Sequence, residues 1–463
     1  MRLIYQIWHE DNDKPRRSAL KRVENGQLLG GLILWWHHLD NMKAIVRSMS
    51  SLAVFFLLVA FWYQAIQLNW DPNTVDGVEV GEPPYLGADV HKYSSFFRGF
   101  PATIEDIKSA SSISTLAKER IFVEYWKRPL WGPVSAALSL GASELFGLAF
   151  PSRMLLVLAL YSSACVCLLF ALLRSAGVRW EWATLMSAIA TVAFGWLSMF
   201  SIPESASLAA MGALIAMLSG ANLPVGRNAP KKLLLHCLIT GFMAWLHLTI
   251  CGAVLFILRS IDQRRQVFTI LLPCVALVCF VALLPQLFAH TSVNSRMQGG
   301  IAFQINYGAM YGNLTNWFDV KYWLDATFAF LTFILVSPIN HFASSPGTVQ
   351  WDVVFSRPAA LGASLVVIAT YVCSGLVFWR RASFEMRKAL AVPLLWLVLL
   401  IIFYVFFNPR ELLLYLPIPV AVVLYAVGIG LSDVKMKGQT WITAMLLVML
   451  ITCAFLNFPA VFS

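Results

Sequence analysis

The run "LLLHCLITGFMAWLHLTICGAVLFIL" (residues 233–258) decides the fold class of this chain. It contains no Asp, Glu, Lys or Arg, and it exceeds the roughly 20 apolar residues that cross about 30 Å of hydrocarbon as a helix. Hydrocarbon offers the backbone no hydrogen-bond partners, so an apolar run at that depth must be helical. The sequence therefore predicts an integral membrane protein built from helices.

Basic stretches stand on both sides of this run, "RNAPKK" (227–232) and "RSIDQRRQ" (259–266). Short basic stretches between apolar runs are typical of cytoplasmic loops, so both flanks belong to the same side. We predict that the run breaks near Trp245–His247 and that two short helices meet within the membrane. Irregular backbone at that depth is tolerated only where it lines a cavity or is covered by protein.

The rest of the chain repeats this composition. Of its 463 residues, 59% are hydrophobic and 13% are charged, whereas a soluble domain carries about 25% charged residues. We expect an all-α polytopic membrane protein with about 11–13 transmembrane or half-membrane helices. The candidate crossings are 51–69, 131–149, 152–173, 182–200, 203–220, 233–258, 267–290, 326–343, 359–379, 390–407, 411–431 and 440–459. Strict alternation of sides also fails at 131–149 and 326–343, so we interpret both as half-crossings.

The apolar runs and the polar segments between them divide the chain into four regions. Residues 70–130 carry more acidic than basic residues and lack the basic excess of cytoplasmic loops, so we place them outside the cytoplasm. The regions are 1–49, a cytoplasmic tail whose first 41 residues we expect to be dispensable or to derive from an upstream start; 50–290, a transmembrane catalytic module that includes 70–130; 291–358, an extracytoplasmic segment with a half-crossing; and 359–463, the C-terminal transmembrane helices.

The net charge of +10 does not indicate a nucleic-acid partner. Basic residues gather in short stretches between apolar runs, also at "RRASFEMRK" (380–388) and "SDVKMKG" (432–438). This distribution is the positive-inside pattern of a protein embedded in membrane lipids. All eight cysteines fall inside apolar runs, which argues against a disulfide framework or a metal-ligand spacing. We expect them to be small packing residues.

A polar cluster stands at the edge of the first crossing, in "YLGADVHKYSSFFRGF" (85–100). Asp89 follows a stretch rich in Pro and Gly, which favours a fixed turn. It could cap a helix over the following residues, and it could also serve as a catalytic carboxylate, with His91 and Lys92 beside the substrate. The two roles are compatible, because a cap holds a carboxylate in place.

Three further groups combine polar residues with apolar surroundings. In "VEYWKRPLWGP" (123–133), Lys127 and Arg128 could be interfacial cations that extend toward water or ligands of a lipid phosphate, whose oxygens a guanidinium fits well. Glu204, after a proline, could complement a helix N-terminus or contact a substrate hydroxyl. His247, at the predicted break, could be a satisfied core histidine or a substrate ligand.

The last candidates lie between the C-terminal crossings, on the side opposite the basic stretches. Arg410 in "FFNPRELLLYLPIPV" (406–420) departs from the positive-inside pattern there and requires another explanation; Tyr415 follows it by about one turn. Arg357 and Arg296 belong to the same side. No Gly-rich phosphate loop, HExxH zinc site or GxSxG elbow is present, which argues against a cytoplasmic nucleotide-using enzyme.

These features in this order resemble the GT-C superfamily of membrane glycosyltransferases. In that family, the first crossing leads into a long extracytoplasmic loop with an acidic catalytic residue and interfacial helices, followed by a basic, proline-containing stretch. The matching stretches are "GADVHKY" and "KRPLWGP", and "GFMAWLHLTICG" takes the place of a broken helix pair with His247 where the family has a cation. One proline replaces two at position 129, and one well-placed aspartate replaces an acidic pair.

The resemblance implies transfer of a sugar from a polyprenyl-phosphate donor to a glycan, lipid or protein acceptor, by inversion, with Asp89 as general base. It implies that outward cations bind the donor phosphate: Arg410, Lys127, Arg357 and Arg128. Glu204, His91, Lys92, His247 and Tyr415 would contact the substrates. The resemblance identifies no certain cofactor and does not decide whether a divalent cation takes part. The location would be a bacterial inner membrane, with the site facing the periplasm.

Two alternatives remain at this point. One is a lipid-linked oligosaccharide polymerase or ligase, which depends less on a single acid in the first loop. The other is a transporter or flippase of lipid-linked sugar, which would favour inverted repeats between two halves. No such repeat is evident in the sequence, and its polar candidates gather on one side.

Overall fold

The computed structural model describes residues 51–68, 131–149, 152–201, 206–224, 229–261, 267–290, 318–336, 362, 383–407, 416–432 and 439–462. Most of these residues are helical, and none of them forms a strand. The predicted all-α class is therefore confirmed for this part of the chain.

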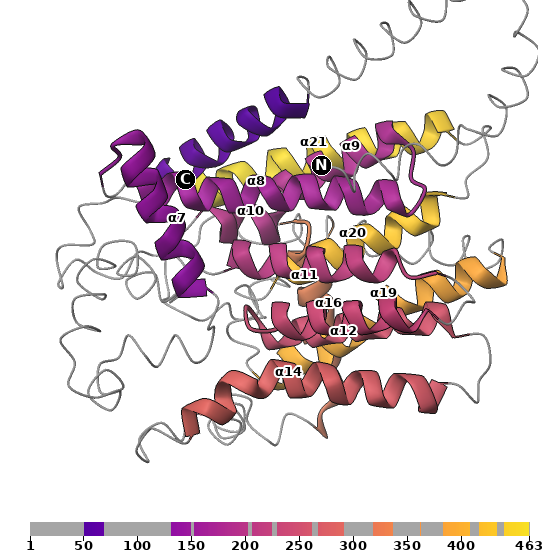
Figure 1. The fold of residues 1–463 in the computed structure, drawn as a ribbon. Helices are drawn as coiled ribbons and strands as arrows, with labels where there is room; N and C mark the ends of the chain where they lie inside the picture. The colour runs from indigo at the N-terminus through magenta and orange to yellow at the C-terminus, as the bar shows by residue number, and fades with distance from the viewer. Residues whose placement is uncertain are drawn as a thin grey trace, which may run out of the picture. The chain divides into compact units, whose positions relative to one another are not determined.

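The chain divides into two units, Met1–Leu57 and Leu58–Ser463. Residues 51–57 of the first unit are helical and belong to a helix that runs from Ser51 to Leu68. The further elements belong to the second unit (Figure 1): α7 (Trp131–Phe146), α8 (Ser152–Ser175), α9 (Trp180–Val192), α10 (Phe194–Phe200), α11 (Ala206–Ala221), α12 (Pro230–Met243), the 3₁₀ helix η2 (Leu248–Ser260), the π-helix η3 (Val267–Leu271), α14 (Leu272–His290), α16 (Val320–Phe333), α19 (Phe384–Phe407), α20 (Pro417–Ser432) and α21 (Gln439–Phe462).

Five described helices are long and apolar enough to cross a membrane: Ser51–Leu68, Ser152–Ser175, Val267–Leu284, Met386–Tyr404 and Gln439–Phe462. Helices α9 and α10 make a sixth crossing if they are counted together across their 54° bend. The predicted crossings at 203–220 and 411–431 correspond to α11 and α20, each 16 residues long, which is shorter than a full crossing of about 20 residues. Of the predicted crossing at 359–379, only Gly362 is described.

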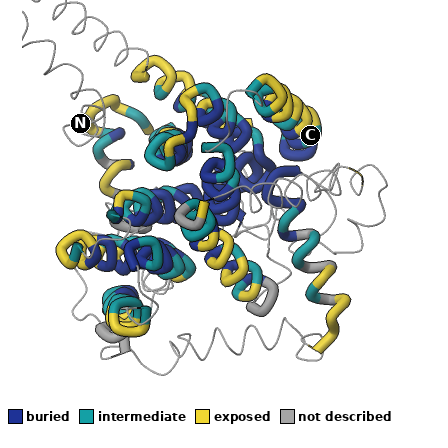
Figure 2. Tube along the Cα trace, turned by 90° about the vertical axis from the view of Figure 1, so that its right-hand side faces the viewer, coloured by how far each residue is buried: buried dark blue, intermediate teal, exposed yellow. Residues whose placement is uncertain are grey.

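Large apolar side chains cover the outside of the described helices in the second unit. Figure 2 shows exposed residues on the outer sides of the tubes and buried residues between them. On α21, Trp441, Val448, Ile451 and Phe455 are all more than 60% exposed. A monomeric soluble protein rarely presents such a large apolar surface to water, so this surface indicates contact with lipid. The structure is that of a polytopic helical membrane protein.

The predicted break in the run 233–258 is present. Helix α12 ends at Met243, residues 244–247 turn, and η2 begins at Leu248. The two helices then lie side by side in opposite directions, because His236 of α12 contacts the carbonyl oxygen of Ala253 in η2. Leu233, near the start of α12, packs in one cluster with Ile257 and Ile261 from the end of η2. The chain therefore returns to the end from which it entered, as the basic flanks predicted.

Helix ends gather where this hairpin begins and finishes, and we call this the basic end. The Arg259 guanidinium donates to the carbonyl oxygen of Ala221 at the end of α11, and the Lys388 ammonium donates to that of Ile261 after η2. Arg174 donates to Val178 just after α8. Cations near the C-terminal carbonyls of helices are favourable, because those carbonyls form the negative end of the helix dipole. Seven of the nine described Lys and Arg residues lie at this end: Arg174, Arg179, Lys231, Lys232, Arg259, Arg387 and Lys388.

Candidate functional site

Two histidines of the hairpin lie inside the bundle, and His236 of α12 is fully satisfied. Its Nε2 lies 3.0 Å from the Ala253 carbonyl oxygen and its Nδ1 lies 2.7 Å from the Ser219 hydroxyl. A carbonyl oxygen only accepts, so Nε2 carries the proton. In the neutral ring, Nδ1 then accepts from the Ser219 hydroxyl, whose single proton is shared with the Ala216 carbonyl oxygen 2.9 Å away. A second ring proton would create a buried cation, which is costly without a counter-charge. His236 is therefore a neutral packing residue that joins α11, α12 and η2.

His247 stands at the turn of the hairpin and caps η2. Its Nδ1 accepts from the backbone N–H of Thr249 at 3.4 Å and lies 2.7 Å from the Thr249 hydroxyl oxygen. That hydroxyl lies 3.0 Å from the hydroxyl of Tyr404 on α19. In the arrangement that satisfies all three groups, Tyr404 donates to Thr249 and Thr249 donates to Nδ1. The proton of the neutral, half-buried ring is then on Nε2.

Helix α19 also holds the backbone at this turn. The indole N–H of Trp396 donates to the carbonyl oxygen of Thr249 at 3.2 Å. One turn further along η2, a Cβ on Gly252 would lie 2.2 Å from the Trp396 Nε1. Glycine is required there because the indole fills the space that any side chain would need. His247 is thus positioned by two side chains of α19 rather than by its own hairpin alone.

A second break in the chain forms what we call the α10 junction. Helix α9 stops at Val192, and α10, a fully buried helix of seven residues, continues after the 54° bend. The backbone N–H of Phe194 donates to the carbonyl oxygen of Leu335, just past α16, at 3.2 Å. Asn457 of α21 donates to that same carbonyl at 2.7 Å and to the Val192 carbonyl at 2.8 Å. Side-chain and backbone donors therefore replace the bonds that the bend removes.

Further contacts join two more parts of the chain to α10. The Trp196 indole donates to the carbonyl oxygen of Pro417 at the start of α20, at 2.8 Å. At the other end of α10, Phe200 stacks on Trp196 and meets Trp62 of the first helix edge to face, with ring centroids 5.5 Å apart. Tyr404, which bonds to Thr249 beside His247, lies 6.1 Å from Phe330 of α16 between ring centroids. The hairpin turn is therefore linked to the junction through α16.

Of the residues that the sequence nominated for the site, the structure describes His247. The others lie outside the described residues: Asp89, His91, Lys92, Lys127, Arg128, Glu204, Arg357, Arg410 and Tyr415. Arg296 lies outside them as well. The residues other than Arg296 lie in four segments: 69–130, 202–205, 337–361 and 408–415.

Each of these four segments has one end at or near the α10 junction. Segment 202–205 follows Ser201 at the end of α10, and segment 408–415 ends at Leu416, whose Cβ would lie 2.8 Å from a Cβ on Gly195. Segment 337–361 begins after Val336, next to the Leu335 carbonyl. Segment 69–130 begins about two turns of helix after Trp62. Its other end, at Trp131, meets α7, which packs on α8 and is not joined to α10 by these contacts.

Three polar residues at these breaks were not nominated from the sequence. Thr249 stands two residues after His247, the spacing at which the side chain of an N-cap residue accepts from the backbone N–H. Tyr404 and Asn457 are single polar residues inside apolar helices, and an isolated polar residue in a membrane helix usually has an interhelical partner. That signal identifies the residues but not their partners, which are 155 and 265 positions away in the chain.

The chemistry available in the described residues is that of hydrogen bonds. Among them, no group of three or more His, Cys, Asp or Glu side chains could hold a metal ion. The neutral His247 ring carries its proton on Nε2, and the hydroxyl and indole groups around it bond to the ring, to each other and to the Thr249 carbonyl oxygen. The acidic residues and the cations that the sequence nominated lie in the four segments named above.

The chain was compared with protein-family models, with curated proteins and with solved structures. No significant match was found in any of the three. The function must therefore be argued from the residues and the geometry.

Proposed function

We propose that this protein is a membrane glycosyltransferase of the GT-C type, which transfers a sugar from a polyprenyl-phosphate donor to an acceptor hydroxyl. The observation that supports this proposal is the convergence at the α10 junction. Each of the four segments that carry the nominated base, cations and polar ligands has one end at or near this junction, and Lys127 and Arg128 stand at the other end of segment 69–130, beside α7. A reaction between a lipid-borne phosphate and a hydroxyl needs such groups around one point.

In this reaction, the acceptor oxygen attacks the anomeric carbon as the bond from that carbon to the phosphate oxygen breaks. Asp89 takes the proton from the acceptor hydroxyl, a contribution of about 10²- to 10⁴-fold for general-base catalysis. Arg410, Arg357, Lys127 and Arg128 stabilise the negative charge on the departing polyprenyl phosphate. A single displacement inverts the configuration at the sugar carbon. Glu204, His91, Lys92, His247 and Tyr415 orient the two substrates.

The charge distribution supports an orientation for this site. Seven described cations lie at the basic end, which the positive-inside rule assigns to the cytoplasm. Helix α9 starts at that end, just after Gly177. The 13 residues of α9 separate α10 from the basic end. We therefore place the site in the extracytoplasmic half of the membrane, which would be the periplasmic side of a bacterial inner membrane.

The test is transfer of radiolabelled sugar from a panel of polyprenyl-phosphate donors by the full chain in nanodiscs. Wild type is compared with Asp89→Asn and with Glu144→Gln, which alters an exposed carboxylate of α7 and serves as the matched control. We expect transfer by wild type and by Glu144→Gln, and at least a 100-fold loss for Asp89→Asn, at the lower bound of general-base catalysis. Size-exclusion profiles establish that all three proteins are folded.

Three results would overturn parts of this proposal. Equal transfer by wild type and Asp89→Asn would remove Asp89 from the mechanism and make Glu204 the next base to test. Absence of transfer with every donor and acceptor, together with movement of the lipid-linked sugar across the bilayer, would replace the enzyme by a flippase. Joining of whole lipid-linked oligosaccharides would instead identify a polymerase or ligase.

A further inference from the structure

Arg259 lies inside a ring of four helices at the basic end. Helix α11 packs on η2 and on α20, and α19 packs on the same two helices. From the last turn of η2, the Arg259 Nη1 donates to the carbonyl oxygen of Ala221 on α11 at 3.4 Å and to the hydroxyl of Tyr425 on α20 at 3.3 Å. Side chains three residues apart lie on the same side of a 3₁₀ helix, so Phe256 lies one turn deeper than Arg259. Its ring meets that of Tyr425 with centroids 5.8 Å apart, and the two buried rings close the inner side of this ring of helices.

The hydrogen-bonding capacity of Arg259 is only partly used. Both of its bonds come from Nη1, and both are longer than the usual 2.7–3.2 Å. Its Nε is buried and has no partner among the described residues, and the hydroxyl of the next residue, Ser260, is buried and unpaired in the same way. Buried donors without an acceptor are costly. The guanidinium edge formed by Nε and Nη2 could bind two oxygens of one anion, once the loosely held side chain turns that edge outward.

Lys388 of α19 brings a second cation to the end of η2. Its ammonium donates to the carbonyl oxygen of Ile261, just after η2, and an ammonium has three N–H donors. Arg259 and Lys388 are both half-buried, and among the described residues neither has a carboxylate partner. A partly buried charge without an opposite charge is unfavourable. Two such cations at the end of one helix therefore indicate that an anion binds beside them.

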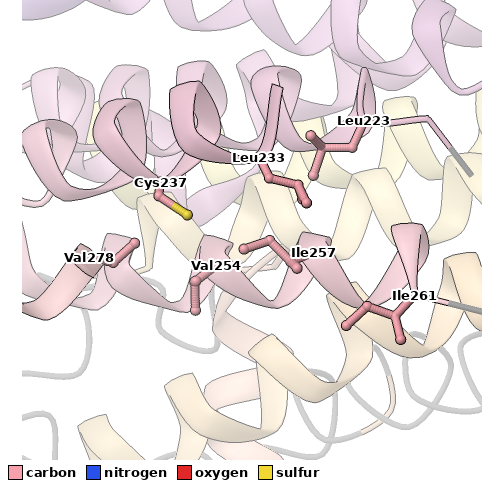
Figure 3. Close-up of a cluster of buried hydrophobic side chains, with 7 residues drawn as sticks. All are labelled: Leu223, Leu233, Cys237, Val254, Ile257, Ile261 and Val278. Atoms are coloured by element: carbon pink, nitrogen blue, oxygen red, sulfur yellow. The ribbon is translucent and has the colours of Figure 1, made fainter. Parts of the chain in front are cut away.

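The opposite side of η2 is held in place by apolar packing. Ile257 and Ile261 belong to one cluster with Leu223, which follows α11, and with Leu233 of α12 (Figure 3). This cluster fixes the end of η2 against α11 and α12. The backbone that carries Arg259 is thus set before any ligand binds, and only the side chain has to move.

We propose that Arg259 and Lys388 bind a phosphate group at the basic end. Phosphate oxygens fit the guanidinium fork, and one phosphate can neutralise both cations. At the cytoplasmic face of a membrane, this group is carried by lipid headgroups, which bind in basic pockets between transmembrane helices, and it is also present free in water. The bound phosphate joins the end of η2 to α19. The site lies away from the α10 junction, and the inference does not depend on the proposed transferase activity.

The experiment measures thermal unfolding of the full chain in detergent, because a ligand that binds the folded state raises the unfolding midpoint. The probes are dioleoyl phosphatidic acid, with dioleoyl phosphatidylcholine as its control, and inorganic phosphate, with sodium chloride at equal ionic strength. A Kd follows from the dependence of the midpoint on probe concentration. Arg259→Gln, Arg259→Lys and Lys388→Gln are compared with Arg179→Gln. Arg179 is the matched control, because it lies at the same end and is paired with Glu181.

We expect phosphatidic acid to raise the midpoint of wild type and of Arg179→Gln with equal Kd. Loss of a charge-assisted hydrogen bond should weaken binding at least ten-fold in Arg259→Gln and Lys388→Gln. Arg259→Lys keeps the charge but not the fork, so it should bind more weakly than wild type, and it tests the site even if Arg259→Gln does not fold. A shift with phosphatidic acid alone assigns the phosphate to a lipid, and a shift with inorganic phosphate assigns it to the group itself; both support the proposal. No shift with either probe in wild type would overturn it. Equal weakening by Arg179→Gln and Arg259→Gln would overturn it as well, because diffuse surface charge would then explain the binding.

Discussion

Asn457 replaces, with one side chain, the hydrogen bonds that a bent helix loses. It is fully buried, and its amide group donates to the carbonyl oxygens of Val192 and Leu335. The Leu335 carbonyl also accepts from Phe194, whereas Asn457 is the donor that the described residues provide for the Val192 carbonyl. An amide in this position allows α9 to end inside the membrane.

Asn457→Leu should therefore destabilise the protein by about 1–3 kcal/mol, the cost of leaving a buried polar group without a partner. The measurement is the thermal unfolding of the Asn457→Leu protein in detergent, and Asn222→Leu is the control variant. Asn222 is exposed, and its amide bonds to the carbonyl oxygen of Leu218 in the last turn of α11, so its change should stay within about 0.5 kcal/mol. Equal midpoints of thermal unfolding for the two variants would show that the bend does not depend on the Asn457 amide.

Tyr404 and Thr249 should act as one unit with His247, because Thr249 accepts from one and donates to the other. Tyr404→Phe and Thr249→Val each interrupt this series of hydrogen bonds. The double variant should therefore lose less stability than the sum of the two single variants, with a coupling energy of about 0.5–3 kcal/mol. The control cycle combines Thr249→Val with Tyr161→Phe, which bonds to Ser135 instead. Additive losses of stability in both cycles would contradict a shared hydrogen-bond chain.

The sequence identified one of these residues and missed the others. His247 could be nominated because it interrupts an apolar run at a predicted break, and the structure confirms both the break and its position. Tyr404 and Asn457 were missed because each lies in a predominantly apolar stretch of its helix, where the local sequence gives no sign of a functional role. Their importance comes from partners on other helices, and helix packing rather than local pattern decides those partners.

At the scale of elements, η2 departs from ordinary helix geometry. It keeps 3₁₀ form over 13 residues, although such runs seldom exceed 3–4 residues. At about 2.0 Å per residue, it spans about 26 Å, against about 21 Å for the 14 residues of α12. Its fit against α19 depends on Gly252, where the Trp396 indole occupies the position of a side chain.

Gly252→Ala should cost about 1–3 kcal/mol, since a rigid indole has to move to admit even a methyl group. Gly141→Ala is the matched control: it lies in α7 with nothing within 4 Å of its added Cβ, so it should be neutral or stabilise the helix by up to about 1 kcal/mol. Unfolding midpoints of the two variants in the same detergent provide the measurement. A Gly252→Ala protein as stable as wild type would mean that η2 and α19 are not tightly packed.

Element prediction succeeded where an apolar run had clear flanks. The crossings expected at 152–173, 390–407 and 440–459 correspond to α8, α19 and α21 within a few residues. The crossings expected at 203–220 and 411–431 end within a residue of α11 and α20, and their first residues include 203–205 and 411–415, which lie outside the described residues. The bend at Ala193 was missed: "ATVAFGWLSMF" (190–200) contains no proline, and the bonds from Asn457 and to Leu335 that accompany the bend come from distant residues.

At the scale of the whole molecule, polarity is divided between the two ends of the described helices in the second unit. Cations cap helix C-termini at the basic end, whereas the α10 junction uses neutral donors such as Asn457 and Trp196. Charged side chains are tolerated near water but are expensive near the bilayer centre. This division predicts which end of the molecule faces the cytoplasm.

The proposed orientation can be tested with single cysteines at opposite ends of the bundle. Asn222→Cys lies at the basic end after α11, and Ala149→Cys lies before the start of α8; both positions are exposed. Helix α8 has 24 residues and spans about 36 Å, so these two ends belong to opposite faces of the membrane. We expect a membrane-impermeant maleimide to label Ala149→Cys in intact cells, and Asn222→Cys only after the membrane is opened. Wild type gives the background from native cysteines. The reverse pattern would place the basic end outside, and the α10 junction would then face the cytoplasm, where a donor carried by the outer leaflet could not reach it.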